Sequence, residues 1–297
     1  QLIRGKMIMS DLAYINGQFM NLDQATVSIE DRGFQFGDSI YEVIKLYDGK
    51  LFALEEHLER MLSGIKKIDI NLDYNIKELK EICQKVVAKN EKNTKVESGS
   101  LYIQITRGEA PRSHGFAADL KPTIVMYLLP AKNLDEQLRK EGAKAITVPD
   151  QRWDLCNVKS TNLLPNILSK QAAKQKNVTE AILVDEEDIV TEGSSSNVFI
   201  VKDGIIKTHP ATKSILGGIT RDLVLALATN KFSVVAEKFT LKDLYQADEV
   251  FITSTTKEVL SVVEVDNKSI SNGQIGEITK ELYNDYQDYI ANWKQNN

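Results

Sequence analysis

The spacing of the apolar residues constrains this chain most, because it changes between the helical and the strand period over short distances. A helical spacing covers residues 54–68 and then residues 76–87. Apolar and polar residues then alternate over 101–106, as in a strand with one buried face, and 123–129 is continuously apolar, as in a central strand. Strands and helices in such blocks predict an α+β first half.

The second half has short strands separated by turns and helices. Asp203-Gly204 between two apolar runs is a strong hairpin signal. One helix is expected over about 163–175, with Pro165 tolerated in its first turn. Two more are expected to begin at Gly218-Ile219 and near Ile275. The expected strands cover 145–148, 181–184, 198–201, 205–206 and 249–253.

The chain is long enough for two domains, at ~100–200 residues each. The segment 130–137 begins with proline, continues with polar residues and follows a strand, so it is the expected interdomain linker. The prediction is therefore a two-domain α+β or α/β protein. Residues 1–129 form its smaller α+β domain and residues 138–297 its larger domain.

Charge and cysteine content limit the partners and the compartment. A net charge of −5 argues against a nucleic-acid partner, which would favour a basic face, and against binding to a membrane surface. No apolar run approaches the ~20 residues of a membrane span, and no signal peptide is visible. Two cysteines are too few for a disulfide framework, so we expect a cytoplasmic protein. Residues 1–8 are expected to precede the natural start, because Met9-Ser10 resembles an initiation site.

Two segments of the second half could hold a cofactor. Lys159 lies between a strand and a helix, where its side chain can point into a cleft; a partly desolvated amine there could form a Schiff base. Most lysines are simply solvated, so this position alone decides nothing. Glu192 precedes a turn with three serines, which would suit a cofactor with a protonated ring nitrogen, although a solvated turn fits equally well.

Two stretches are suited to an anion. Leu216, the two glycines after it, Ile219 and Thr220 open a helix, whose first amides and dipole would face a phosphate. Ser254 and Thr255 belong to a run of four hydroxyl residues that ends a strand. Each stretch could also be an ordinary cap or turn. Arg60 lies on the polar side of the first helix, where a surface charge is the simplest explanation.

A proline-led loop in the first half carries an arginine and a histidine two residues apart. Arg112 and His114 follow the strand at 101–106, and both could contact one carboxylate, the arginine through its planar fork. An isolated Arg-x-His pair on a surface usually has no such role. The other two histidines, His57 on a helix and His209 before a proline, have structural explanations, and no metal site is expected.

Taken in order, these segments resemble the fold-type IV, branched-chain-like, pyridoxal-phosphate (PLP) aminotransferases, and among them most closely the bacterial D-amino-acid transaminases. The resemblance runs from about Tyr14 to Tyr286. The segments that carry it are Asp31-Arg32-Gly33-Phe34-Gln35-Phe36-Gly37-Asp38, Tyr41-Glu42-Val43, His57-Leu58-Glu59-Arg60, Arg107-Gly108, Pro111-Arg112-Ser113-His114, Val158-Lys159-Ser160, Thr191 to Phe199, Gly218-Ile219-Thr220-Arg221 and Thr253-Ser254-Thr255-Thr256.

The resemblance implies a role for each matched residue. Lys159 would form the Schiff base and move the substrate's α-proton, and Glu192 would bond the pyridine nitrogen. The phosphate would be held by Arg60, Ile219, Thr220 and Thr255, with Ser254 beside them, and the ring lined by Ser195 and Leu216. Tyr41, Arg112 and His114 would bind the substrate α-carboxylate. The resemblance also implies a barrel-like larger domain, a site between the domains and an obligate homodimer in which this loop reaches the neighbouring subunit.

Three functions remain open at this point. The Arg112-x-His114 pair favours transamination of D-amino acids, with 2-oxoglutarate or pyruvate as the acceptor. A branched-chain L-amino-acid aminotransferase or an aminodeoxychorismate lyase would share Lys159 and Glu192 but lack that pair. A catalytically silent PLP-binding protein is disfavoured by the intact lysine and glutamate. The chain departs from the family pattern at Phe34, Ser39 and Lys213.

Overall fold

A computed structural model describes residues 12–91, 98–131 and 134–297, and it divides into two compact units. Unit 1 comprises Gln1–Lys132 together with Val158–Asn162. Unit 2 comprises Asn133–Asn157 and Leu163–Asn297. The domain limits 1–129, 130–137 and 138–297 stay a prediction, and the expected start after residue 8 lies outside the described residues. The segment with Lys159 thus groups with the first unit, although the rest of the second half does not.

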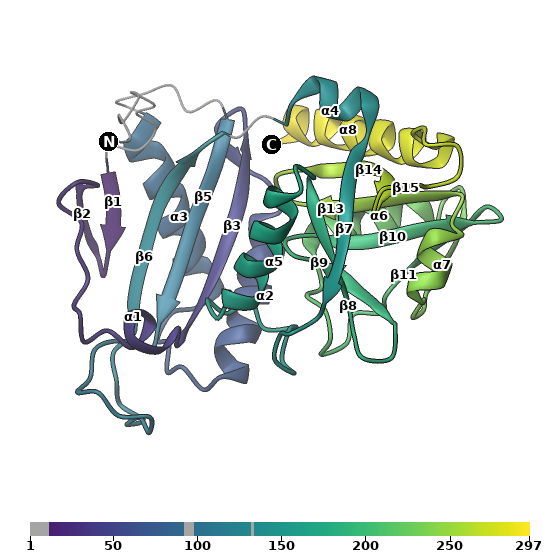
Figure 1. The fold of residues 1–297 in the computed structure, drawn as a ribbon. Coiled ribbons are helices and arrows are strands. Elements are labelled where there is room, and N and C mark those ends of the chain that lie inside the picture. The colour runs from purple at the N-terminus through teal and green to yellow at the C-terminus, as the bar shows by residue number, and fades with distance from the viewer. Residues whose placement is uncertain (1–11, 92–97, 132–133) are drawn as a thin grey trace. The chain divides into compact units, whose positions relative to one another are not determined.

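Unit 1 is a six-stranded antiparallel sheet with the order β2-β1-β6-β5-β3-β4. Helices α2 and α3 pack against one of its faces (Figure 1). The central ladder joins β3 to β5 from the pair Ser39–Thr106 to the pair Tyr47–Ser98. The elements are β1 (Leu12–Ile15), β2 (Gln18–Asn21), α1 (Arg32–Phe36), β3 (Ser39–Tyr47), β4 (Lys50–Leu51), α2 (Leu54–Lys67), α3 (Ile76–Glu91), β5 (Ser98–Thr106) and β6 (Thr123–Pro130).

The core of unit 1 follows from the periodicities. Both predicted helices and both predicted strands of this half are confirmed, and their apolar stripes form one buried cluster that includes Leu58, Met61, Leu101 and Ile103. Strand β3 was not predicted. Its inward positions alternate as a strand requires, but one of them is the fully buried Glu42, which interrupts the apolar pattern.

Unit 2 is built on a nine-stranded mixed sheet. Its order is β12-β11-β10-β13-β14-β7-β8-β9, with β15 paired to β14. Because β9 also contacts β10, the sheet curls back on itself. The elements are α4 (Glu136–Glu141), β7 (Ala143–Pro149), α5 (Leu164–Gln175), β8 (Glu180–Val184), β9 (Val190–Gly193), β10 (Asn197–Lys202), β11 (Ile205–Thr208), α6 (Ile219–Ala228), β12 (Ser233–Ala236), α7 (Leu241–Tyr245), β13 (Glu249–Ser254), β14 (Glu258–Val265), β15 (Lys268–Ser269) and α8 (Glu277–Asn296).

The local predictions for unit 2 are confirmed. Strands β10 and β11 pair as a hairpin in which Asp203 and Gly204 have φ values of 50° and 74°, the signature of a type I′ turn. Helix α5 has its proline in the first turn, and α6 begins at Ile219 with Gly218 as its N-cap. Within the described ranges, no helix combines the length and the apolarity needed to cross a membrane.

Candidate active site

The backbone around Lys159 pairs with the start of β3 inside unit 1. The amide of Tyr41 donates to the carbonyl of Lys159 at 3.0 Å, and Ile40 and Ser160 form an antiparallel bridge. Strand β3 thereby fixes the lysine segment, although 118 residues separate Tyr41 from Lys159 in the sequence (159 − 41). The Lys159 amine lies 4.3 Å from the centre of the Tyr41 ring, so these two predicted site residues are side by side.

Arg60 is not an unpaired surface charge. Its Nε and Nη2 both donate at 2.7 Å to the fully buried carboxylate of Glu42, which also contacts His57 Nδ1 at 2.7 Å. Burial alone would raise the pKa of Glu42. The Arg60 charge and the hydrogen bond with His57 outweigh this effect and lower the pKa to about 2. Glu42 is therefore ionised at neutral pH and orients the Arg60 guanidinium, which extends from α2.

Arg112 and His114 lie on an exposed loop between β5 and β6, and both contact Phe36. The Arg112 guanidinium carbon is 4.5 Å from the Phe36 ring centre, and the His114 ring centre is 5.7 Å from it. Tyr41 instead stacks on Tyr102 at 6.0 Å. Neither loop residue forms a hydrogen bond or ring contact with Tyr41 in the part of the chain that the structure describes, so these three do not form a trap within unit 1.

In unit 2, Glu192 lies near the end of β9 and is buried. Its carboxylate accepts hydrogen bonds from the Leu216 amide at 3.2 Å and from Asn197 Nδ2 at 3.1 Å, and it forms an ion pair with Arg152. Burial raises the pKa of Glu192 to about 7 despite the nearby guanidinium. A buried carboxyl group with such a pKa can exchange a proton with a ring nitrogen at neutral pH.

Arg152 is a site residue that the sequence did not suggest. Besides Glu192, its guanidinium binds Asp150 through two atoms at 2.9 and 2.7 Å, and it donates to the Ser214 carbonyl at 3.1 Å. Burial opposes its charge, but Asp150 and Glu192 keep its pKa above the usual range. Asp150, two residues earlier and directly after β7, is the local clue to such a pair.

The serine-rich turn after Glu192 is hydrogen-bonded to another buried acid, Glu180. Its carboxylate accepts from the hydroxyls of Ser195 at 3.3 Å and Ser196 at 3.0 Å, and from Ser194. Lys257 pairs with Glu180 at 2.8 Å and also reaches the Ser195 hydroxyl at 3.3 Å. Glu180 therefore connects the turn that carries Ser195 to the segment that follows Ser254 and Thr255.

The start of α6 and the end of β13 converge on Asn197. A Cβ on Gly218, the α6 N-cap, would lie 2.2 Å from Asn197 Oδ1, so a larger residue there would displace the Asn197 side chain. Asn197 pairs across the sheet with Thr253, whose buried hydroxyl has no hydrogen-bond partner among the described residues. The α6 N-cap makes no side-chain capping bond, which leaves the Ile219 and Thr220 end open to an anion. Leu216, at the start of this loop, contacts Glu192.

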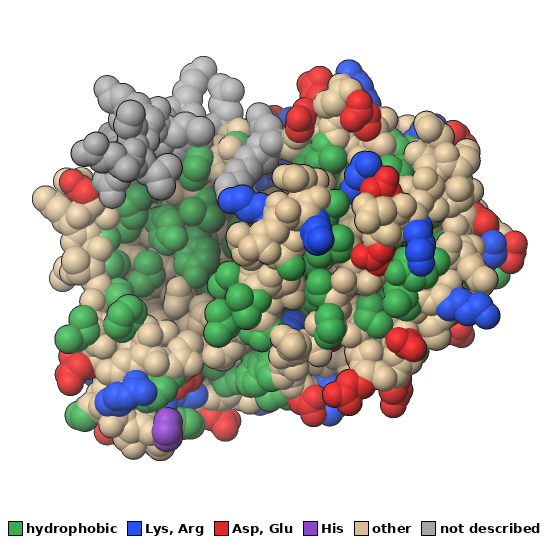
Figure 2. Space-filling view, viewed as in Figure 1, with side chains coloured by type: hydrophobic (Ala, Val, Ile, Leu, Met, Phe, Trp, Pro, Cys, Tyr) green, Lys and Arg blue, Asp and Glu red, His purple; other side chains and the backbone are tan. Residues whose placement is uncertain are grey.

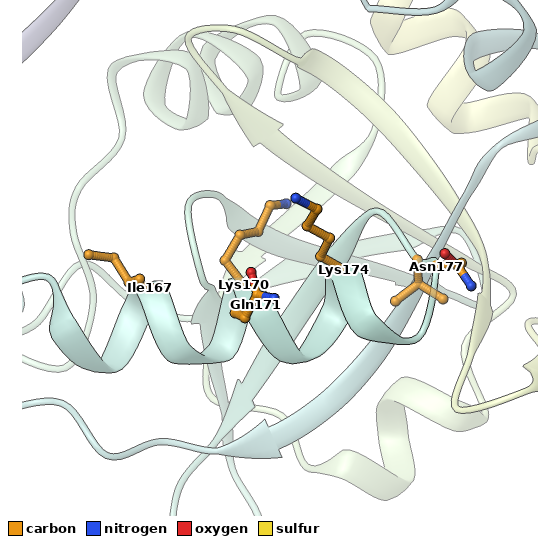
Figure 3. Close-up of a pocket in the computed structure, with 6 residues that line it drawn as sticks. Ile167, Lys170, Gln171, Lys174 and Asn177 are labelled. Carbon is orange, nitrogen blue, oxygen red and sulfur yellow. The ribbon is translucent and has the colours of Figure 1, made fainter. Parts of the chain in front are cut away.

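A separate open pocket of about 550 Å³ lies along α5. Figure 3 shows Lys170 and Lys174 rising from this helix with their amino groups toward one another. None of the predicted site residues lines this pocket. Its lining consists of Ile167, Lys170, Gln171, Lys174, Asn177 and Val178. This pocket is therefore distinct from the residues that the sequence predicts to bind a cofactor.

Comparison with known proteins identifies the family. Residues 39–265, about three quarters of the chain, match the amino-transferase class IV family. The chain belongs to the class IV aminotransferases. It is 44% identical over 279 residues to a D-alanine aminotransferase of Staphylococcus epidermidis, covering 93% of this chain and 97% of that protein. It is 43% identical to the Bacillus licheniformis D-alanine aminotransferase, with 93% and 95% coverage.

Solved structures support the same fold. The branched-chain amino acid aminotransferase of Escherichia coli superposes with a TM-score of 0.84, at 27% identity and 92% coverage of both chains. A 4-amino-4-deoxychorismate lyase of Pseudomonas aeruginosa gives 0.82, covering 93% of this chain and 98% of that one; at 23% identity it bears on the fold alone. The prediction of a fold-type IV PLP enzyme with an α+β fold is confirmed.

The residues of unit 2 fit PLP. The cofactor carries a basic ring nitrogen and a phosphate, and unit 2 has groups suited to each. The buried Glu192, fixed by Arg152, suits the nitrogen. The uncapped start of α6 and the unpartnered hydroxyl of Thr253 suit the phosphate.

Proposed function

We propose that this class IV aminotransferase transfers the amino group of D-amino acids, of the D-alanine type, to 2-oxo acids with PLP as its cofactor. The observation that carries this proposal is the 44% identity to a D-alanine aminotransferase over nearly the full length of both proteins. The Arg112-x-His114 pair, on an exposed loop and therefore available to a carboxylate, supports it.

The proposed roles are those that the family resemblance implies, and the contacts of Glu192 support its role. Lys159 would hold the cofactor covalently until the substrate amine takes its place, and the lysine amine released in that exchange would move the proton at the substrate α-carbon. Glu192 bonds the ring nitrogen, and Arg152 keeps this carboxylate in place. When bound, PLP withdraws electrons from the α-carbon, so that its proton can leave.

The anionic groups of cofactor and substrate have their own partners. The phosphate is proposed to bind Ile219 and Thr220 at the α6 start, with Arg60, Ser254 and Thr255; Ser195 and Leu216 line the ring. Tyr41, Arg112 and His114 are proposed to bind the substrate α-carboxylate. A carboxylate held by an arginine fork and a histidine has its orientation fixed relative to the amine, which the transfer of a single proton requires.

We further propose a homodimer, in which helix α5 contributes to the interface. Its side chains Leu164, Ile167 and Leu168 are 66%, 58% and 57% exposed, whereas Asn166 on another side bonds the Ser194 carbonyl within the unit. Figure 2 shows hydrophobic side chains at the surface where Figure 1 places α5. A helix with an exposed apolar face is typical of a protein–protein contact.

A cytoplasmic location is proposed because both cysteines are free.

A second candidate function is transamination of branched-chain L-amino acids, favoured by the TM-score of 0.84 to the Escherichia coli enzyme. The two are distinguished by incubating the purified holoenzyme with D-alanine or with L-leucine, each with 2-oxoglutarate, and measuring the glutamate formed. We expect glutamate from D-alanine, and only the background of the Lys159→Ala variant from L-leucine. Turnover of L-leucine alone would refute the D-amino-acid assignment.

A further inference from the structure

The loop that carries Arg112 and His114 is pinned at its base. A Cβ on Gly108, where φ is +101°, would lie 1.9 Å from the carbonyl oxygen of Lys121, so the two ends of the loop cross at a distance that only glycine permits. The Gly108 carbonyl accepts from the Arg32 amide at 2.9 Å, and the Ala110 amide donates to the Glu30 carbonyl at 3.3 Å. The loop therefore leaves the sheet in a fixed direction.

The middle of the same loop is held by the side chain of Arg32, which is only 4% exposed. Its Nη1 donates to the carbonyls of Ser113 at 2.6 Å and Gly115 at 3.5 Å, and its Nη2 donates to the carbonyl of His114 at 3.2 Å. Three consecutive carbonyl groups thus face one buried guanidinium. With the backbone bound on the inside, the side chains of Arg112 and His114 remain exposed.

Arg32 is itself oriented by Asp38. The Arg32 Nε donates to Asp38 Oδ2 at 2.9 Å, and Arg107 binds both oxygens of the same carboxylate at 2.8 and 2.9 Å. Burial raises the pKa of Asp38, but its bonds to Arg107 and Arg32 lower it below its usual value. The carboxylate is therefore ionised at neutral pH, and a planar guanidinium bound at its Nε can aim both of its Nη atoms at the loop.

Phe36 connects the clamp to the exposed side chains. The Arg32 guanidinium carbon lies 4.8 Å from the Phe36 ring centre and that of Arg112 lies 4.5 Å from it, while the His114 ring centre is 5.7 Å away. The aromatic ring thus restricts both residues that are proposed to bind the substrate.

We propose that Arg32 is a positioning residue for substrate recognition: by binding the carbonyls of residues 113–115 it holds Arg112 and His114 in the arrangement that receives the substrate α-carboxylate. Phe36 assists by stacking against Arg112. This inference rests on the proposed function for its kinetic consequence. The clamp itself, a backbone loop held by a buried fork, is independent of which amino acid is the substrate.

Arg32→Lys tests the proposal, because lysine keeps the charge but cannot bind three carbonyls and Asp38 at once. Binding of a carboxylate in both ground and transition states affects KM more than kcat. Since a misplacement of ~1 Å can cost ~100-fold, we expect the KM for D-alanine to rise at least ~10-fold while kcat changes less than ~3-fold. Phe36→Leu should raise the KM for D-alanine by about 3-fold, because it removes the exposed cation–π contact between Phe36 and Arg112. The absorption spectrum and the Kd of PLP should not change.

Asn90→Ala is the matched control, because Asn90 is also buried in unit 1, at 2% exposed, and donates to the Leu12 carbonyl. The second readout is trypsin cleavage after Arg112, which we expect to be faster in Arg32→Lys than in wild type or Asn90→Ala. If both KM and cleavage rate match those of the control, Arg32 has no positioning role. If wild type fails to transaminate D-alanine, the proposed function is wrong, and the cleavage rate alone then decides whether Arg32 holds the loop.

Discussion

At the scale of single residues, the Glu192 carboxylate depends on Arg152 for its charge. Burial alone would favour the neutral acid, and the guanidinium, 40 residues away in sequence, is the main opposing influence. Asp150 and the Ser214 carbonyl hold that guanidinium in place. In the proposed site, the cofactor's ring nitrogen would therefore face Glu192 together with Arg152, and only Glu192 belongs to the family motif.

Replacing Arg152 with methionine should raise the pKa of Glu192 above its value of about 7 and weaken both PLP binding and turnover. Hydrogen bonds to charged groups contribute about 1.5–3 kcal/mol, so we expect roughly a ten- to hundred-fold loss in kcat/KM at pH 7. The acidic limb of the pH–rate profile should move to higher pH, because the neutral acid persists further. Steady-state rates from pH 5 to 9 measure this.

Lys159→Ala is the reference for this comparison, since it should abolish the absorption of the lysine-bound cofactor and nearly all turnover at every pH. Arg152→Lys, which keeps the charge but not the fork, should fall between wild type and Arg152→Met. A reduced rate with an unmoved acidic limb in Arg152→Met would show that Arg152 acts on stability and not through Glu192.

At the scale of elements, local sequence patterns predicted what local forces determine. The apolar stripes of α2 and α3, the Asp203-Gly204 turn and the glycine start of α6 all lie where the sequence placed them. Strand β3 was missed because Glu42 occupies an inward position, where Arg60 and His57 satisfy its charge. Such pairing of residues from different elements cannot be inferred from spacing alone.

The turn after β9 illustrates the same limit, because its stability comes from Glu180 on β8. Burial raises the pKa of Glu180, yet Lys257, Lys170 and the Ser194 hydroxyl lower it from 4.5 to about 2. A carboxyl whose pKa is lower in the folded state stabilises the fold above its unfolded pKa, and this contribution is lost as pH falls from about 4.5 to about 2. Its size is on the order of 3 kcal/mol.

Glu180→Gln should therefore lower the free energy of unfolding by about 3 kcal/mol at pH 7 and by much less near pH 3, where wild type has lost part of the same contribution. Urea unfolding at both pH values measures the difference. Glu187→Gln, the same change at an exposed position of unit 2, should have little effect at either pH. An equal destabilisation by Glu180→Gln at pH 7 and pH 3 would mean that its charge is not the cause.

At the scale of the whole molecule, the sequence identified the candidate site residues but did not predict which of them contact one another. Lys159 with Tyr41, and Glu192 with Leu216, are each in contact within one unit. Arg112 and His114 instead contact Phe36 and are exposed. The resemblance to the family predicts that all of them belong to one site. A loop held rigidly by Arg32, with its functional side chains exposed, is suited to serve a second copy of the chain.

If Arg112 serves the site of the neighbouring subunit, two inactive variants should complement one another. Lys159→Ala and Arg112→Ala are each expected to be nearly inactive as homodimers. After mixing, unfolding and refolding at equal amounts, half of the dimers should be hybrids, and each hybrid would hold one site with both Lys159 and Arg112 intact. For a symmetric dimer with exchanged loops we expect about a quarter of the wild-type activity. Loops that serve their own subunit leave no intact site in any hybrid, so activity no higher than that of the separate variants would contradict the exchange.

The role proposed for α5 has its own test. Leu164→Glu combined with Leu168→Glu, which places charge on the exposed face of α5, should reduce both the dimer mass measured by light scattering and the restored activity. Restored activity in a protein that remains a monomer would contradict the role assigned to α5.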